Sequence, residues 1–121
     1  MLGLRTVIYK VGDINQAKAW YSVAFDRKPY FQDTKYIGFN IGGYELGLQP
    51  ESKKVEARSE SVVAYWGVDD IHATYFRLLE LGAAEHEKPT SVGGEIMVAT
   101  VRDPWDNLVG LIYNPNFKLA D

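Results

Sequence analysis

The hydrophobic and polar residues follow one pattern that occurs twice along the chain. An apolar, β-branched and aromatic run at residues 5–10 leads into Val11–Ile14, and a similar run at residues 61–66 leads into Val68–Ile71, 57 residues later. Self-similarity at a fixed offset indicates a repeated structural unit. Because two such offsets span nearly all of the 121 residues, the pattern predicts two modules.

The predicted modules occupy residues 1–50 and 61–115. Residues 51–60, between them, are rich in charged residues and serine, which is typical of a linker. A chain of this length fits one domain. We therefore expect a single domain over residues 1–121, made of two similar halves.

Each repeated motif is followed by an amphipathic helical pattern. In the first module Asp13 is a typical N-cap with Gln16 three residues on, and Pro29 marks the end of the helix. Asp70 is the N-cap of the second helix, and Gly82 is a C-terminal helix signal. The positions at helical spacing are Ile14, Ala17, Tyr21 and Phe25 in the first helix, and Ile71, Thr74, Tyr75, Leu78, Leu79 and Leu81 in the second.

Strand signals follow each helix. Gly42-Gly43 predicts a two-residue hairpin turn, Pro50 closes the strand after it, and Asp103–Asp106 forms a second tight loop. Each module thus has a strand, a helix and then two or three strands, which predicts an α+β fold with mixed sheets. The strands predicted after the helices are residues 30–32, 35–41 and 44–49, then 85–88, 95–102 and 107–114.

The hairpin turn fixes which residues face each other across the first sheet. A two-residue loop pairs Ile41 with Tyr44, and therefore Asn40 with Glu45. Alternation makes one face wholly apolar, so this face is expected to cover the helix. The apolar face holds Ile37, Phe39, Ile41, Tyr44, Leu46 and Leu48, and the opposite face holds Tyr36, Gly38, Asn40, Glu45 and Gly47. In the second module Val109, Leu111 and Tyr113 share the helix-facing side.

Four strand-interior glycines fall on the faces that point away from the helices. They are Gly38, Gly47, Gly67 and Gly110. A glycine inside a strand marks a bulge or bend, or the close approach of a ligand or another backbone. Because Tyr36, Asn40, Glu45 and Tyr65 share this surface, the pattern favours a hollow that binds a ligand, with bulges as the alternative.

Composition and charge exclude several classes of function. The chain carries a formal charge of −3 with 46% hydrophobic and 24% charged residues, which is ordinary for a globular protein. The mild acidity disfavours nucleic-acid binding, and no apolar run approaches the length of a membrane span. The absence of cysteine, and of a signal-peptide pattern at residues 1–6, predicts a cytoplasmic protein.

Several of these motifs resemble the vicinal oxygen chelate superfamily, which groups glyoxalase I, extradiol dioxygenases and bleomycin-resistance proteins. Val11–Ile14 with Trp20-Tyr21 resembles the start of its module, and Leu79–Gly82 and Asp103–Asn107 resemble its later motifs. The resemblance implies two tandem βαβββ modules whose curved mixed sheets enclose a cleft. It also implies a homodimer and a small-molecule ligand.

Glyoxalase-like members hold a divalent metal through His, Gln and Glu on equivalent strands of both modules. Carried over to this chain, the four ligand positions are Thr6, Glu45, Val63 and Gly110. Only Glu45 retains a carboxylate, and a stable divalent site needs several N or O ligands. The resemblance therefore implies that the metal is absent and that no cofactor is needed.

The two histidines do not supply the missing ligands. His72 is expected in the first turn of the second helix, and His86 in a loop or edge region away from the cleft face. Glu45 is the one candidate catalytic residue, and its pKa should rise if the cleft is apolar. The predicted cleft residues are Thr6, Lys10, Tyr36, Asn40, Glu45, Val63, Tyr65, Thr100, Gly110 and Ile112.

Three functions remain open. The favoured one is a binding protein of the bleomycin-resistance-like type, which sequesters an aromatic or cationic ligand in an apolar cleft without a metal. The second is a glyoxalase I-like lyase or isomerase, or a metal-free acid–base enzyme that uses Glu45. The third is a dimeric interaction module with a filled cleft.

Overall fold

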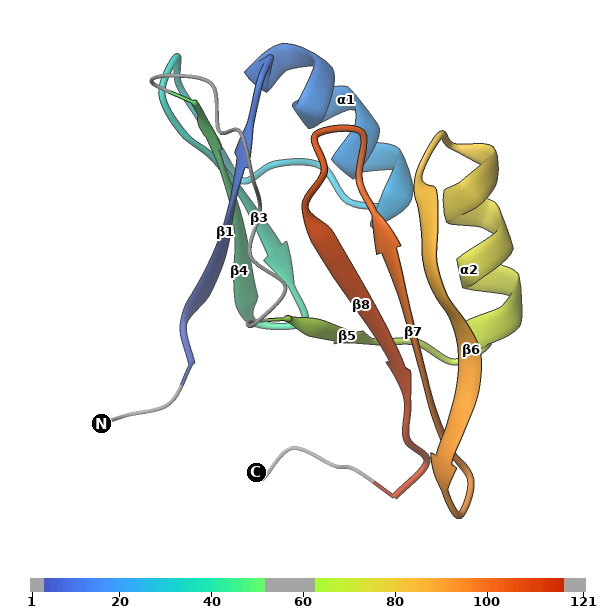
Figure 1. Cartoon of the computed structure of the whole chain (residues 1–121). Coiled ribbons are helices and arrows are strands. Elements are labelled where there is room, and N and C mark those ends of the chain that lie inside the picture. Colours follow the sequence, from blue (N-terminus) through green and yellow to red (C-terminus); the bar gives the residue numbers. More distant parts are fainter. Residues whose placement is uncertain (1–3, 52–62, 117–121) are drawn as a thin grey trace. The chain divides into compact units, whose positions relative to one another are not determined.

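The computed structural model describes residues 4–51 and 63–116, so most of the predicted linker at 51–60 lies outside the described residues. Over the described ranges the chain is an α+β protein with two helices and two four-stranded mixed sheets (Figure 1). It divides into two compact units, Met1–Arg58 and Ser59–Asp121. Each unit has the βαβββ order that the family resemblance implies, which agrees with the strand, helix and two or three strands that the repeat predicts.

The first unit is one sheet with one helix. Its elements are β1 (Thr6–Val11), α1 (Ile14–Ala24), β2 (Phe31–Gln32), β3 (Ile37–Ile41) and β4 (Tyr44–Pro50). The strand order is β1-β4-β3-β2, with β1 parallel to β4 and the other pairs antiparallel. The first strand of the unit therefore pairs with its last strand.

The second unit repeats this plan. Its elements are β5 (Tyr65–Gly67), α2 (Ile71–Glu80), β6 (Ala84–Gly93), β7 (Ile96–Arg102) and β8 (Leu108–Tyr113). The strand order is β5-β8-β7-β6, with β5 parallel to β8. Strand β5 is shorter than the predicted run, of which residues 61 and 62 lie outside the described residues. Strand β6 is longer than predicted, and its pairing with β7 shifts register three times.

The helix caps agree with the sequence at three of four ends. Asp13 accepts hydrogen bonds from the backbone N–H groups of residues 15 and 16, and Asp70 from that of residue 73. Helix α2 ends at Glu80, and Gly82, just beyond the C-cap Leu81, has a φ of 101° that suits the residue after a helix. Helix α1 ends earlier than Pro29 predicts, because Asp26 adopts a φ of 52° and closes the last turn in the same way.

The hairpin between β3 and β4 confirms the predicted register. Gly42 and Gly43 have φ values of 60° and 95°, as a type I′ turn requires. Asn40 pairs with Glu45, and its side-chain oxygen accepts a hydrogen bond of 2.8 Å from the backbone N–H of Gly43. Sequence reasoning places this hairpin correctly because the turn chemistry leaves one register.

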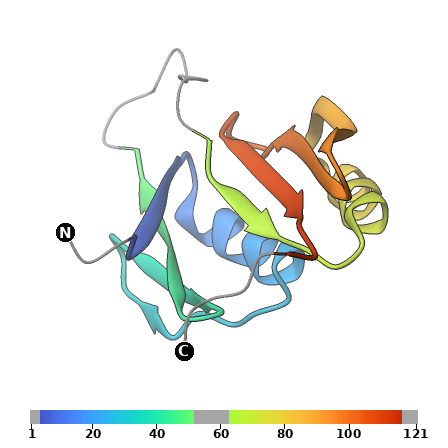
Figure 2. The same ribbon diagram turned by 90° about the horizontal axis from the view of Figure 1, so that it is seen from below.

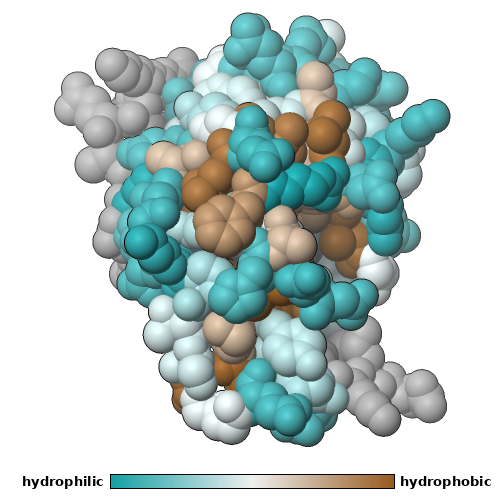
Figure 3. Space-filling view, turned by 90° about the vertical axis from the view of Figure 1, so that its right-hand side faces the viewer, coloured by the Kyte–Doolittle hydropathy of each residue, from teal (hydrophilic) through white to brown (hydrophobic). Residues whose placement is uncertain are grey.

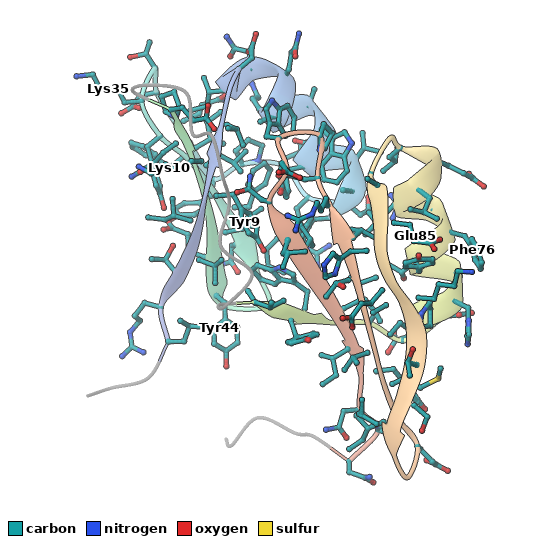
Figure 4. All side chains as sticks on the ribbon, viewed as in Figure 1. Tyr9, Lys10, Lys35, Tyr44, Phe76 and Glu85 are labelled. Carbon is teal, nitrogen blue, oxygen red and sulfur yellow. The ribbon has the colours of Figure 1, made fainter. Side chains whose placement is uncertain are left out.

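Each helix packs on one face of its own sheet (Figure 2). Tyr9 and Lys10 lie on opposite sides of β1 (Figure 4), and the Tyr9 ring stacks on Tyr21 of α1 with centroids 5.8 Å apart. The buried side chains of the first unit include Tyr21, Phe39, Leu46 and Leu48, and those of the second include Tyr75, Leu78, Val101 and Val109. The opposite face of each sheet carries no helix of its own unit.

No helix among the described residues is long and apolar enough to cross a membrane.

Candidate functional site

Three hydroxyl groups among the described residues converge on the carboxylate of Glu45. The Thr6 hydroxyl donates to Glu45 Oε1 over 2.8 Å, and the Tyr36 hydroxyl donates to the same oxygen. The Tyr30 hydroxyl donates to Glu45 Oε2. We call Thr6, Tyr30, Tyr36 and Glu45 the hydroxyl cage; it lies on the face of the first sheet opposite α1.

Backbone geometry brings the cage together. Thr6 pairs with Glu45 in the parallel β1–β4 ladder, so their side chains leave the sheet on the same face. Asp33 holds the turn before β3 because its carboxylate accepts 2.8 Å hydrogen bonds from the N–H groups of Lys35 and Tyr36. The N–H of Tyr30 donates to the carbonyl of Gly38 over 3.0 Å, which fixes the second tyrosine at the start of β2.

Two of the strand glycines make room for the cage. A Cβ on Gly47 would lie 2.7 Å from Tyr36 Cζ, and one on Gly38 would lie 2.9 Å from Glu45 Oε2. Real Cβ contacts do not come this close. The glycines therefore allow the chain's own tyrosine and glutamate side chains to lie flat on the sheet. This explains both glycines without a ligand-filled hollow.

The hydrogen bonds keep Glu45 ionised and both tyrosines neutral. The Tyr30 and Tyr36 hydroxyls lower the pKa of Glu45 below its ordinary value, against a smaller opposing effect of burial. The hydrogen bond to Glu45 raises the pKa of Tyr30, and burial followed by the same carboxylate raises that of Tyr36. The rise in the Glu45 pKa that an apolar cleft would cause is opposed here, because the hydroxyl donors outweigh desolvation.

Exposed aromatic and aliphatic side chains lie in and beside the cage. Tyr30 is 64% exposed, Phe31 46% and Ile8 42%. Ile8 and Lys10 follow Thr6 on the same face of β1, and Lys10 Nζ donates to Gln49 Oε1 on β4. The surface thus combines the negative charge of Glu45 and, further along β1, the positive charge of Lys10 with aromatic and aliphatic contact area.

The corresponding face of the second sheet carries the other predicted residues. Gly110 pairs with Tyr65 on one side and with Thr100 on the other. Ile112 shares this face two residues further along β8, and a Cβ on Gly110 would lie 2.7 Å from both the carbonyl oxygen of Ala64 and the ring of Tyr65. A third strand glycine is therefore a position of close approach, whereas a Cβ on Gly67 would meet no atom within 4 Å.

The structure places Val63 before β5. The residue that pairs with Gly110, as Thr6 pairs with Glu45, is Tyr65. The position carried over from the resemblance therefore lies two residues, or one strand period, before the residue that pairs with Gly110.

His86 corrects the sequence interpretation. Its Nδ1 lies 2.7 Å from Thr100 Oγ1, so its side chain is on the same face of the second sheet as Gly110. The expectation that His86 lies away from this face is wrong. The cause is the irregular pairing of β6 with β7, which simple alternation does not foresee. His72 lies in the first turn of α2, as predicted, and is exposed.

The donor set of the first unit does not fit a divalent metal. Glu45 supplies one carboxylate, and the groups next to it are neutral hydroxyls that hydrogen-bond to its oxygens. A divalent metal site would need further carboxylate or imidazole ligands beside Glu45. The equivalent register positions in the second unit are Tyr65 and Gly110. Over residues 4–51 and 63–116, no group of three or more His, Asp or Glu side chains could hold a metal ion.

A separate cavity of about 320 Å³ lies between α2 and β6. Phe76 and Glu85 lie beside it (Figure 4), and hydrophobic side chains reach the surface on this side of the molecule (Figure 3). The Tyr75 hydroxyl is buried here without a hydrogen-bond partner among the described residues. Burial, followed by hydrogen bonding toward the neighbouring Glu85 carboxylate, raises the pKa of Tyr75 to about 12, although the two groups lie outside ordinary hydrogen-bond geometry.

Tyr75→Phe is expected to raise the free energy of unfolding by about 1 kcal/mol, because a buried hydroxyl without a partner costs about 1–3 kcal/mol. Tyr36→Phe is the matched control and is expected to lower it, since that hydroxyl bonds a carboxylate. Urea unfolding of both variants measures the difference. A loss of stability in Tyr75→Phe would show that its hydroxyl is hydrogen-bonded in solution.

Comparison with known proteins gives a family. A family model described as the Glyoxalase/Bleomycin resistance protein/Dioxygenase superfamily matches residues 3–111. No curated protein sequence matches the chain.

Solved structures share the fold. A glyoxalase-related enzyme from Fulvimarina pelagi has a TM-score of 0.81 at 16% identity, covering 99% of this chain and 94% of that one. The fosfomycin resistance protein FosX from Listeria monocytogenes has a TM-score of 0.78 at 19% identity, covering 96% of each chain. FosX from Mesorhizobium loti has a TM-score of 0.75 at 18% identity, covering 96% and 95%. At these identities the likeness concerns the fold.

Proposed function

We propose a binding function for this chain, which belongs to the Glyoxalase/Bleomycin resistance protein/Dioxygenase superfamily. It binds a small aromatic cation on the open face of the first sheet and sequesters it without chemical conversion, in the manner of a bleomycin-resistance-like protein. The cage carboxylate holds the positive charge, and the exposed aromatic side chains cover the flat part of the ligand.

The observation that carries this proposal is an ionised Glu45 beside exposed rings. Three hydroxyl donors hold the carboxylate in its charged form, while Tyr30 and Phe31 expose large aromatic area next to it. Aromatic rings attract cations through their π faces, and a carboxylate adds a full opposite charge. A neutral ligand would gain only the apolar contacts.

An acid–base enzyme that uses Glu45 is the less favoured alternative. A general base works best when its pKa lies near the operating pH. Hydrogen bonds lower the pKa of Glu45, which makes this carboxylate a weaker base than an ordinary glutamate. A glyoxalase-like lyase or isomerase also stabilises its intermediate with a metal, and the donor set of the cage does not fit one.

We also propose that the protein works in the cytoplasm, as a homodimer and without a metal. The absence of cysteine supports the first point, and the family resemblance supports the second. Native mass spectrometry of protein purified without chelator measures both the dimer and the bound metal. A monomer or a stoichiometric divalent ion would overturn the respective proposal.

Calorimetric titration with 1-naphthylmethylammonium tests the binding function. We expect micromolar affinity for the wild type and at least a tenfold loss for Glu45→Gln, because the substitution removes the charge and keeps the shape. The neutral 1-naphthalenemethanol should bind both proteins weakly and equally. Equal affinity of Glu45→Gln and the wild type for the ammonium would refute the proposal.

The pH dependence follows from the lowered pKa of Glu45. Binding of the ammonium should persist at pH 4.5, the ordinary value for a glutamate, and fall at lower pH as the cage carboxylate becomes protonated. The same titration at stepped pH measures this limit. A midpoint at or above pH 4.5 would show that the hydroxyls do not stabilise the charge.

A further inference from the structure

We infer that the cation of the ligand binds Glu45 at Oε2 by replacing the Tyr30 hydroxyl, and that the ligand is therefore an N–H-bearing cation such as a primary ammonium. This inference rests on the proposed function and assigns the atom at which it acts. It makes Tyr30 a displaceable donor and Tyr36 a permanent one.

The two oxygens of the carboxylate differ. Within the described residues, Oε1 accepts hydrogen bonds from both Thr6 and Tyr36, whereas Oε2 accepts one from Tyr30. A ligand at Oε1 would have to displace two donors that come from different strands of the sheet. A ligand at Oε2 meets a single donor, and exchanging it leaves the bonds of Thr6 and Tyr36 to Oε1 in place.

The two tyrosines also differ in how firmly they are held. The Tyr36 ring is half-buried against Gly47, and its backbone N–H is bonded to Asp33. The side chain of Tyr30 is mostly exposed, with its ring edge near Gly38 and its hydroxyl on Glu45. Rotation of Tyr30 away from the carboxylate costs little packing, and its hydroxyl then bonds to water.

The exchange conserves hydrogen bonds only for certain cations. A primary ammonium donates an N–H to Oε2 in place of the lost O–H and adds a full positive charge, which strengthens the bond. A quaternary ammonium has no N–H and leaves Oε2 without a donor. The cage therefore discriminates between cations of equal charge by their ability to donate.

Gly38 keeps this oxygen accessible. A Cβ at this position would lie 2.9 Å from Oε2 and 3.1 Å from the Tyr30 ring. Any larger residue would crowd the atom that the ligand has to reach. The glycine thus serves the exchange as well as the resting hydrogen bond.

Titration of Tyr30→Phe and Tyr36→Phe with 1-naphthylmethylammonium and its N,N,N-trimethyl analogue tests the inference. Tyr30→Phe should raise the affinity for the primary ammonium three- to tenfold, because it removes the competing donor and keeps the ring. Tyr36→Phe should give no gain. The quaternary analogue should bind the wild type more weakly and respond less than threefold to Tyr30→Phe.

Two further measurements separate the possible failures. A ¹³C NMR titration of the Glu45 carboxyl group without ligand should show a higher midpoint in Tyr30→Phe, which confirms that the removed hydroxyl bonds Oε2. Gly38→Ala should weaken binding of the primary ammonium. If Glu45→Gln abolishes binding but Tyr30→Phe weakens it or strengthens both probes equally, the exchange is wrong and the binding function stands. If Glu45→Gln changes nothing, the binding function itself fails.

Discussion

Gly47→Ala is expected to lower the free energy of unfolding by about 2–3 kcal/mol. The new Cβ would lie 2.7 Å from Tyr36 Cζ, so the ring must leave the sheet. Overpacking of this kind costs about 1–3 kcal/mol, and the lost hydrogen bond to Glu45 adds to it. Urea unfolding measures the change.

The rescue variant identifies the cause. Removing the ring in the double variant Gly47→Ala, Tyr36→Ala gives the Cβ its space, so the cost of Gly47→Ala should nearly vanish in the Tyr36→Ala background. Gly67→Ala is a neutral control, since a Cβ there meets no atom within 4 Å. Equal losses for Gly47→Ala in both backgrounds would show that the backbone, and not the tyrosine, requires glycine.

Gly110 is a matched case in which truncating the neighbouring tyrosine should not restore stability. Its added Cβ would lie 2.7 Å from the carbonyl oxygen of Ala64 as well as from the Tyr65 ring. A side-chain truncation at Tyr65 removes only the second contact. Gly110→Ala should therefore remain destabilising in a Tyr65→Ala background.

Asp103→Ala is expected to lower the free energy of unfolding by about 2–4 kcal/mol. Asp103 is 3% exposed, and its carboxylate accepts hydrogen bonds from the N–H of Trp105 at 2.9 Å and from the N–H and side-chain amide of Asn107 at 2.8 and 3.0 Å. Alanine leaves these three donors without their acceptor in the β7–β8 turn. A buried donor without an acceptor costs about 1–3 kcal/mol, and the three costs do not add in full because the turn can relax and admit water.

Asp103→Asn is the graded control for this turn. Its side-chain oxygen can still accept from the two backbone N–H groups, while its amide faces the Asn107 amide and loses that bond. Chemical unfolding should therefore rank the wild type above Asp103→Asn, and Asp103→Asn above Asp103→Ala. Equal stability of the alanine and asparagine variants would show that the backbone bonds do not organise the turn.

Local chemistry made much of the fold predictable. Gly42-Gly43 leaves one hairpin register, and the N-caps Asp13 and Asp70 locate the helix starts. Asp103–Asn107 supports the family resemblance, and the structure shows that Asp103 closes the turn between two strands. These predictions succeed because each depends on residues only a few positions apart.

The candidate site was predicted only in part. Its contacts depend on how far each side chain extends from its strand, which alternation does not describe. Alternation and the family resemblance place Thr6, Tyr36 and Glu45 on one face, and the structure brings them into contact. Tyr30 was missed as a site residue, since it precedes a two-residue strand and only its long side chain reaches Glu45. The sequence does contain a weak signal for Tyr30, because a tyrosine next to a predicted strand is long enough to reach the polar face of the adjacent strand.

The strand glycines and His86 show where alternation fails. A glycine predicts a close approach but does not say what approaches, and at Gly38 and Gly47 it is the chain's own side chains. His86 reaches Thr100 because β6 shifts register against β7. Bulges depend on the packing of the whole sheet, so a period-two pattern cannot locate them.

The parallel pairing of β1 with β4 has a kinetic consequence. Thr6 and Glu45 are 39 residues apart in sequence, so their contact requires the chain to close a long loop after the β3–β4 hairpin has formed locally. The hairpin alone lacks the Thr6 hydroxyl. We therefore expect the hydrogen bond from Thr6 to Glu45 to form last in this unit, when the first strand docks on β4.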